Sequence, residues 1–306
     1  MSEYHNPVLL DESISALIGS PKGIYADATF GGGGHTSEIL RRIDPEGRVI
    51  SFDRDSDAIA NKPDDDRLTL IRSDFRWIQN HIIHQGYRAG IDGILADLGV
   101  SSHQFDTAER GFSFRYEAPL DMRMNQKGKL TARDIIAEYS EEQLADVFYY
   151  YGELKQSRRL AAAIVKARSS KGDIATTGQL AELAGPLLGF DREKKDLAKM
   201  FQALRIEVNG EMKVLKQMLE QATDILAPGG RLVIMTYHSL EDRIVKNHIK
   251  GTDKKDKNHT DAHAMIFGQT KTALKPINKN VITASAEELA RNPRSRSAKL
   301  RIAEKS

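Results

Sequence analysis

Residues 24–36 read IYADATFGGGGHT, an apolar run that passes directly into a turn of four glycines. The run is short and bounded by glycine, which predicts a buried strand over residues 24–30. A helix is expected near residues 35–43, and RVISFD at 48–53 predicts a second buried strand. Strand, turn, helix and strand make a βαβ unit, the building block of a parallel sheet.

The alternation of strands and helices continues on both sides of a long helical stretch. Apolar runs at 68–71 and 91–98 predict two more strands, the second carrying Asp97 near its end, and RLVIMTY at 231–237 predicts a returning strand. A helix is expected at 239–249, a loop or partly disordered arm at 251–283 and a final strand at 297–303. Between the strands at 91–98 and 231–237 the periodicity is helical. Helical segments are expected there at 131–138, 140–150, 154–170, 177–188 and 196–226.

These patterns predict an α/β fold, a doubly wound and mostly parallel sheet with an inserted all-helical domain. The predicted boundaries are 1–105 for the first part of the sheet domain, 106–215 for the inserted domain and 216–306 for the second part of the sheet domain. The 306 residues are enough for two domains that each bury a core.

Composition excludes several classes of protein. The formal charge is only +2, so any nucleic-acid contact must rest on local patches. There is no cysteine, which excludes a disulfide framework, a thiolate metal site and a cysteine nucleophile, and which fits a reducing cytoplasm. No apolar run approaches the roughly 18 residues of a membrane span, and no metal site is predicted.

The glycine turn and Asp53 together predict a nucleoside cofactor. Glycines let a backbone approach a ligand closely, and Asp53 ends the next strand, where a carboxylate can accept hydrogen bonds from both hydroxyls of a ribose. Read as G-x-G-x-x-G from Gly31, the motif has Thr36 at the third glycine, so a pyrophosphate dinucleotide fits poorly. S-adenosylmethionine fits better: its amino-acid end can meet the turn and Asp27, and Phe75 can supply an aromatic edge for the adenine.

The substrate is expected at the carboxyl edge of the same sheet, where open α/β folds bind ligands. Asp97 leads into Gly99-Val100-Ser101-Ser102, and His238 follows the returning strand at the same edge. The stretch from 109 to 124 mixes arginines, carboxylates and aromatic rings, which suits a flipped base and its phosphates; its candidate RNA-contacting residues are Arg110, Phe112, Asp121 and Arg123. The alternatives are a structural loop whose charges pair with one another, and a structural role for His238.

Several unusual strings in one order resemble the family of bacterial small-subunit rRNA methyltransferases that methylate N4 of a decoding-centre cytidine. They are HNPVLL at 5–10, DATFGGGGHT at 27–36, DLGVSSHQFDTAERGFSF at 97–114, PLDMRM at 119–124, FQALRIEVN at 201–209, HSLEDRIVK at 238–246 and NPRSRSAKLR at 292–301. The resemblance runs nearly end to end. It implies a class I S-adenosylmethionine-dependent methyltransferase, a substrate in 16S rRNA of the small ribosomal subunit, and a possible homodimer.

The resemblance also implies a set of cofactor contacts, namely Gly33, Gly34, His35, Asp53, Phe75, Asp97 and Gln104. The sequence departs from the family at His103, where proline is usual, and at 191–196, where DREKKD replaces a segment that often holds a His-Pro pair. The first departure puts the loop beside the substrate in doubt; the second is expected to alter only the surface of the insertion.

Cytosine N4 is a poor nucleophile, so we expect catalysis by positioning and by acceptance of its N–H hydrogen bond. Asp97 is the first candidate acceptor, in competition with a role toward the cofactor; Ser101, Ser102 and His238 are secondary polar contacts. Residues 251–306 hold 12 Lys and Arg against 6 Asp and Glu, and Arg294 and Arg296 are the favoured phosphate contacts.

Three other functions are less well supported by these patterns. A methyltransferase acting on DNA or protein is disfavoured by the resemblance, and a nicotinamide-linked oxidoreductase by the glycine pattern. A non-catalytic RNA-binding assembly factor is disfavoured by the intact glycine turn, Asp53 and Asp97.

Overall fold

A computed structural model describes residues 7–189, 192–252 and 273–306. Expectations that fall on His5, Asn6, Asp191 or residues 253–272 therefore lie outside the described residues. The chain divides into two compact units, one of residues 1–99 and 213–306 and the other of residues 100–212. The boundaries expected from the sequence lie a few residues further along the chain in each case.

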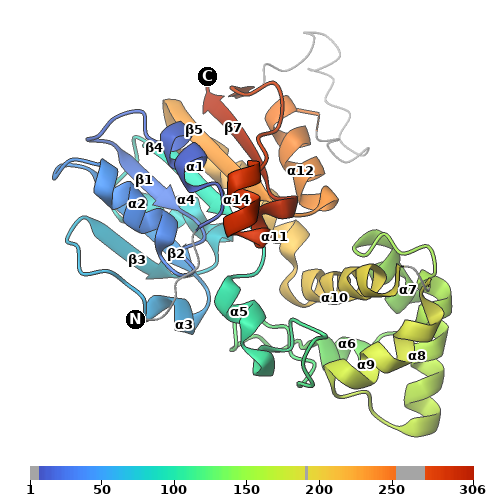
Figure 1. The fold of residues 1–306 in the computed structure, drawn as a ribbon. Helices are drawn as coiled ribbons and strands as arrows, with labels where there is room; N and C mark the ends of the chain where they lie inside the picture. The colour runs from blue at the N-terminus through green and yellow to red at the C-terminus, as the bar shows by residue number, and fades with distance from the viewer. Residues whose placement is uncertain (1–6, 190–191, 253–272) are drawn as a thin grey trace, which may run out of the picture. The chain divides into compact units, whose positions relative to one another are not determined.

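The first unit is built on a seven-stranded sheet in the order β3-β2-β1-β4-β5-β7-β6. Strands β1 to β5 pair in parallel, whereas β7 runs antiparallel to both β5 and β6. The strands are β1 (Ile24–Asp27), β2 (Arg48–Asp53), β3 (Leu68–Arg72), β4 (Ile91–Asp97), β5 (Leu226–Thr236), β6 (Leu274–Pro276) and β7 (Lys299–Lys305). Figure 1 shows this sheet with the helices that surround it.

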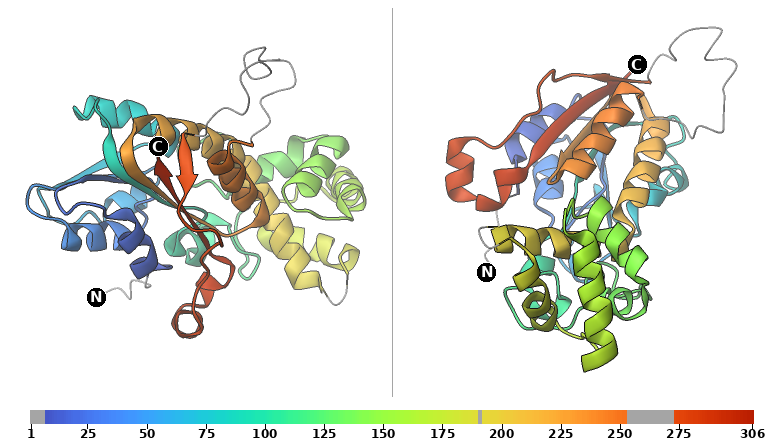
Figure 2. Two further views of the ribbon diagram at one scale, coloured as in Figure 1. Left: turned by 90° about the horizontal axis from the view of Figure 1, so that it is seen from above. Right: turned by 90° about the vertical axis from the view of Figure 1, so that its right-hand side faces the viewer.

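Helices cover both faces of the sheet (Figure 2). Neighbouring residues of one strand enter different cores: Tyr25 packs in one cluster with α1 and α2, and Ala26 in another with α4, α11 and α12. This follows from the alternation of side chains along a strand, so both faces of the central strands are apolar. The helices are α1 (Leu10–Leu17), α2 (Gly34–Arg42), α3 (Ser56–Ile59), α4 (Ile78–His84), α11 (Glu211–Ile225), α12 (Ser239–Lys250) and α14 (Ala286–Arg291), with short turns η1 (Phe75–Trp77) and η5 (Pro293–Ser297). The predicted doubly wound, mostly parallel sheet is confirmed.

The second unit is helical, and local sequence sets where several of its helices start. Capping boxes join Ser101 to Gln104, Thr131 to Asp134, Ser140 to Gln143 and Thr176 to Gln179, each satisfying two backbone amides at a helix start. The helices are α5 (Ser102–Asp106), α6 (Ala132–Glu138), α7 (Glu141–Tyr150), α8 (Ser157–Lys171), α9 (Thr177–Ala184) and α10 (Glu193–Asn209), with short turns η2 (Ala108–Arg110) and η3 (Gly185–Leu187).

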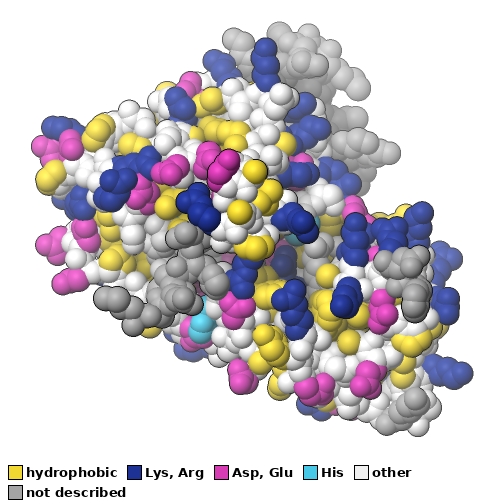
Figure 3. Space-filling model, in the orientation of Figure 1, with side chains coloured by type: hydrophobic (Ala, Val, Ile, Leu, Met, Phe, Trp, Pro, Cys, Tyr) yellow, Lys and Arg dark blue, Asp and Glu magenta, His cyan; other side chains and the backbone are white. Residues whose placement is uncertain are grey.

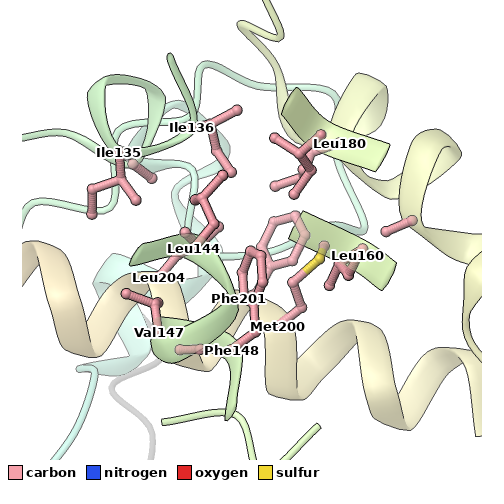
Figure 4. Packing of buried hydrophobic residues seen from close by; sticks show 14 of the residues in the cluster. Ile135, Ile136, Leu144, Val147, Phe148, Leu160, Leu180, Met200, Phe201 and Leu204 are labelled. Carbon is pink, nitrogen blue, oxygen red and sulfur yellow. The ribbon is translucent and has the colours of Figure 1, made fainter. Parts of the chain in front are cut away.

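One apolar cluster holds these helices together. Phe148 of α7 and Leu204 of α10 have no exposed surface and Phe201 has 3%, and Figure 4 shows them packed with residues of α6, α8 and α9. Phe201 also meets Phe114 edge to face, with ring centroids 5.4 Å apart. The unit therefore has a core of its own.

Three expectations about elements were wrong. The segment 196–226 is two helices, because Gly210 ends α10 in the left-handed conformation at φ +58°. Within 251–283, residues 274–276 form β6, since Leu274 is buried and pairs with the last strand. Strand β5 begins at Leu226 rather than Arg231, because Leu226 pairs with Ile91 across a register shift.

Charges of both signs are interspersed over the surface in view in Figure 3, in keeping with the small net charge of +2. Over the described ranges, no helix combines the length and apolarity needed to cross a bilayer.

Truncation of a buried aromatic side chain in the second unit should lower the free energy of unfolding much more than truncation of the exposed tyrosine beside it. Phe148 has no exposed surface, whereas Tyr149 on the same helix is 58% exposed. We expect Phe148→Ala to cost about 3–5 kcal/mol, and Tyr149→Ala less than about 1 kcal/mol, in urea unfolding followed by circular dichroism. Equal losses in the two variants would contradict the packing described here.

Candidate functional site

Three adjacent parallel strands end in aspartate at the same edge of the sheet. Asp27 ends β1, Asp53 ends β2 and Asp97 ends β4, with β1 lying between the other two. The chain runs outward from β1 to β2 and β3 and then returns to the other side of β1 as β4. Crevices outside such a reversal are where open α/β sheets bind ligands, so this edge is the candidate site of the first unit.

Asp27 is the structural anchor of this edge. Its side chain has no exposed surface, and its carboxylate accepts hydrogen bonds from the backbone N–H of Thr29 at 3.0 Å and from Oγ1 of Thr36 at 2.7 Å. Thr36 lies 2.7 Å from the hydroxyl of Ser51 on β2. Burial raises the pKa of Asp27. The enclosed carboxylate holds the glycine turn in place, which favours a structural role for Asp27. Contact of Asp27 with the cofactor stays a prediction.

The glycine turn exposes backbone where side chains would collide. Gly31 and Gly33 adopt φ of +53° and +79°, a region that favours glycine. A Cβ on Gly33 would lie 2.8 Å from the ring of Phe30, and one on Gly34 would lie 2.3 Å from Cγ of Pro7. Helix α2 begins here with no side chain capping its first amides. The turn therefore presents backbone N–H groups at a helix start, where a negatively charged group is favoured.

Asp53 is fixed to that same turn. One carboxylate oxygen accepts the backbone N–H of Gly31 and the other that of Asp55, each at 2.8 Å. Burial raises the pKa of Asp53, although these two hydrogen bonds act against it. Each oxygen of an ionised carboxylate can accept more than one hydrogen bond, so Asp53 can hold a pair of hydroxyls while it holds the turn.

Asp97 is paired with a residue that the sequence analysis did not select, Tyr237. The phenol donates to a carboxylate oxygen of Asp97 at 2.6 Å, and the backbone N–H of Asp97 donates to Oγ1 of Thr29 at 2.7 Å. Burial raises the pKa of Asp97, against the effects of His35 and Tyr237, and burial together with Asp97 raises the pKa of Tyr237 well above 10. The available signal for Tyr237 was its position just after a parallel strand.

The two predicted histidines have structural partners. His35 is buried in the first turn of α2, with Nε2 3.1 Å from the carbonyl oxygen of Val8. His238 is the N-cap of α12: its Nδ1 accepts the N–H of Glu241 at 3.5 Å, and its Nε2 lies 3.1 Å from a carboxylate oxygen of Glu241. These contacts favour the structural interpretation of His238.

Phe75, Arg294 and Arg296 also belong to the first unit. Phe75 begins η1 just after β3 and packs, partly buried, against the core. Arg294 and Arg296 are exposed on η5. Both arginines therefore lie at the surface, as a phosphate contact requires.

Ser101, Ser102 and Gln104 belong to the second unit. Ser101 and Gln104 are engaged with each other as the capping box of α5, and Gln104 is 5% exposed. His103 is the second residue of α5, a position in the first turn where proline is tolerated, so this departure from the family pattern leaves the helix start intact. The roles of these residues toward cofactor and substrate stay predictions.

The loop residues predicted to contact RNA are buried in the second unit or hydrogen-bonded to other residues of it. Arg110 is 7% exposed and donates to the carbonyl oxygens of Arg123 and Met124 at 3.0 and 3.2 Å, and Phe112 is 6% exposed in the apolar cluster. Arg123 donates to both carboxylate oxygens of Asp121, at 2.8 and 2.6 Å. Burial of Arg110 and Phe112 and the pairing of Asp121 with Arg123 favour the structural alternative. Contact of these four residues with RNA stays a prediction.

The whole chain is similar to known proteins. The model of the MraW methylase family matches residues 2–306. A protein named "Ribosomal RNA small subunit methyltransferase H" from Phocaeicola vulgatus is 57% identical over 99% of this chain and 97% of that protein. A protein of the same name from Bacteroides fragilis is 55% identical over 99% of this chain and 97% of that protein. Another from Christiangramia forsetii is 49% identical over 100% of this chain and 99% of that protein.

Burial of Asp27 makes a prediction about stability and pH. Its pKa in the folded state is above its ordinary value of 3.8, so the folded state holds the proton more tightly and loses stability as the pH rises from about 4 through that raised pKa. The free energy of unfolding of the wild type relative to Asp27→Asn should therefore fall with rising pH, by at most about 1.4 kcal/mol per pH unit.

Urea unfolding at a series of pH values measures this difference. Asp66→Asn is the matched control, because Asp66 is exposed, and its difference from the wild type should stay nearly constant. A flat difference for Asp27→Asn as well would show that the carboxyl is not buried as described.

Proposed function

Because this chain belongs to the MraW methylase family, we propose that it transfers a methyl group from S-adenosylmethionine to the exocyclic N4 of a cytidine in the decoding centre of 16S rRNA, in the small ribosomal subunit. The observation that carries the proposal is the 57% identity over 99% of the chain to a protein named as a small-subunit rRNA methyltransferase. The choice of N4 rests on the family resemblance.

The residues at the sheet edge fit the parts of S-adenosylmethionine, which supplies an electrophilic methyl group on a sulfonium. Gly34 and His35 carry backbone amides at the start of α2, which suit the carboxylate of its amino-acid end. The N–H of Gly33 donates to the carbonyl oxygen of Phe30 at 2.7 Å, so the proposed contact of Gly33 is the close approach of its backbone to the cofactor. Asp53 has acceptor capacity for the two ribose hydroxyls, and Phe75 offers a ring edge for the adenine. Gln104 is a further proposed contact.

Asp97 is the proposed acceptor for the N–H of cytosine N4. The lone pair of this nitrogen is conjugated with the ring, which makes it a poor nucleophile. The residues at the edge must therefore hold N4 in line with the methyl group and accept a hydrogen bond from its N–H. Tyr237 donates to one oxygen of Asp97 at 2.6 Å, which orients the carboxylate and favours its ionised form, the form that only accepts hydrogen bonds. A contact of Asp97 with the cofactor is the alternative role.

Other polar groups take secondary parts in this proposal. Ser101, Ser102 and His238 are candidate contacts to the base. The chain has no cysteine, so the route in which a thiolate attacks C6 to permit methylation at C5 has no nucleophile here.

RNA binding is proposed for exposed cations near the end of the chain. Arg294 and Arg296 lie on η5, where a guanidinium can grip a phosphate through two hydrogen bonds. The rest of the basic stretch includes residues 253–272, outside the described residues. The proposed substrate, a small ribosomal subunit, supports a cytoplasmic location for the protein. A homodimer stays a prediction from the resemblance.

Methyl transfer from labelled S-adenosylmethionine to purified small ribosomal subunits and to naked rRNA tests the proposal directly. We expect label in rRNA, and N4-methylated cytidine in mass spectrometry of the nucleosides. Label in another nucleoside would overturn the N4 assignment alone. No label in either RNA, with cofactor binding intact, would overturn the proposed substrate and favour a non-catalytic assembly role.

Asp53→Ala should weaken binding of S-adenosylmethionine by about 1.5–3 kcal/mol, because a charged hydrogen-bond acceptor is lost. Isothermal calorimetry measures the change. Asp66→Ala removes the same charge at an exposed position and should bind as the wild type does. Unchanged affinity in Asp53→Ala would show that the ribose is held elsewhere.

Tyr237→Phe removes only the hydroxyl that donates to Asp97. We expect kcat to fall about tenfold or more with little change in cofactor affinity. The hydrogen bond from Tyr237 lowers the pKa of Asp97. Its removal should therefore move the acid limb of the pH–rate profile to higher pH. A fall in kcat without movement of that limb would indicate a merely structural role.

A further inference from the structure

The second unit carries a pocket that the proposed methyl transfer does not use. Its volume is about 250 Å³, below the roughly 300–1,000 Å³ of pockets that enclose a whole small molecule. It is lined by Tyr139, Gln143, Asp146, Val147, Tyr150, Tyr151 and Glu207, and we call it the acidic tyrosine pocket. Its size suits one side chain of a partner.

The chemistry of the lining is that of a site for an organic cation. Three tyrosines and the acidic residues Asp146 and Glu207 line it, and among the described residues that line it there is neither lysine nor arginine. Ring faces and carboxylates both attract a cation. Two carboxylates alone make a poor metal site, whereas a guanidinium can stack on a ring and pair with a carboxylate at once.

A hydrogen bond between Tyr139 and Glu207 fixes one wall of the pocket. Tyr139, which follows α6, donates to Oε1 of Glu207 on α10 at 2.8 Å. Burial and this hydrogen bond raise the pKa of Tyr139 to about 12, and burial with the charge of Glu207 also raises that of Tyr151. The two phenols are therefore neutral at physiological pH, so the negative charge of the pocket resides on its carboxylates.

Core packing does not account for the two exposed tyrosines that end α7, of which Tyr150 lines the pocket. Tyr149 and Tyr150 end α7 with 58% and 61% of their surfaces exposed, and their rings meet edge to face with centroids 5.2 Å apart. The apolar face of α7 is supplied by Leu144, Val147 and Phe148 instead. Exposed tyrosines are enriched where proteins meet partners.

Charge around the pocket argues against RNA as its occupant. Residues 134–154 contain Asp134, Glu138, Glu141, Glu142, Asp146 and Glu153 and no lysine or arginine. Nucleic acids are held by neutralising their phosphates with cations, and this stretch has only the opposite charge. Helix α10 also carries cations, but Arg205 is paired with Glu211 at 2.8 Å, and Lys194, Lys195 and Lys199 do not line the pocket.

We propose that the acidic tyrosine pocket binds an arginine side chain of a basic protein partner, with Tyr150 stacking on the guanidinium and Glu207 and Asp146 supplying the negative charge. The proposal does not depend on methyl transfer, and its test uses no enzymatic readout.

The test measures binding of the full-length protein to a fluorescent glycine–arginine repeat peptide of 12 residues by anisotropy. The control peptide has citrulline in place of every arginine, which keeps the shape and removes the charge. We expect the arginine peptide to bind at least about tenfold more tightly. Equal binding of the two peptides would overturn the proposal, because no cation would then be recognised.

Variants locate the site. Tyr150→Ala and Glu207→Gln should each weaken the arginine peptide about five- to tenfold; the glutamine retains an oxygen that can accept from Tyr139, so the fold should be kept, as circular dichroism can verify. Tyr116→Ala is the matched control, since Tyr116 is 52% exposed in the same unit and does not line the pocket. Its affinity should equal that of the wild type.

Two further results would overturn the proposal. One is equal weakening by Tyr116→Ala and Tyr150→Ala, which would indicate attraction to the surface in general. The other is loss of binding to a 12-nucleotide oligocytidylate in Tyr150→Ala with the peptide unaffected, which would assign the exposed tyrosines to RNA.

Discussion

Enclosure of the Asp27 carboxylate at the end of β1 is the constraint on which the sheet edge depends. A buried carboxyl group is costly unless its oxygens are hydrogen-bonded, and here Thr29 and Thr36 meet that need from the two sides of the glycine turn. The turn therefore cannot move without exposing or stranding the carboxylate. Through Thr29 the same arrangement reaches the backbone of Asp97, and through Thr36 it reaches Ser51 on β2.

The three strand-end aspartates have different tasks because their surroundings differ. Asp27 is fully enclosed, Asp53 joins the turn to the end of β2, and Asp97 receives a phenol from the segment after β5. Burial raises the pKa of all three. Neighbouring strand ends thus combine a fixed backbone turn with two carboxylates that retain capacity to accept hydrogen bonds from ligands.

In the second unit, local interactions set the helix starts and hold the loop, and exposed tyrosines mark its surface. Capping boxes start four of its helices, and Arg110, Asp121 and Arg123 of its loop find partners within it. A mixture of arginine, carboxylate and aromatic residues in one stretch is therefore also what an ordered loop with internal contacts contains. The two tyrosines at the end of α7 differ from these loop residues, because they remain exposed to solvent and do not belong to the apolar core.

Local patterns in the sequence determined the βαβ start, the glycine turn, the positions of Asp53 and Asp97 at strand ends and most of the helices, because strand length, helical period and caps act over a few residues. Only the tertiary structure decided that Asp27 and Arg110 are enclosed, that β6 and β7 add antiparallel strands, and that Tyr237 meets Asp97 across 140 residues of sequence. Burial and hydrogen-bond partners depend on which distant segments pack together, and no short stretch of sequence carries that information.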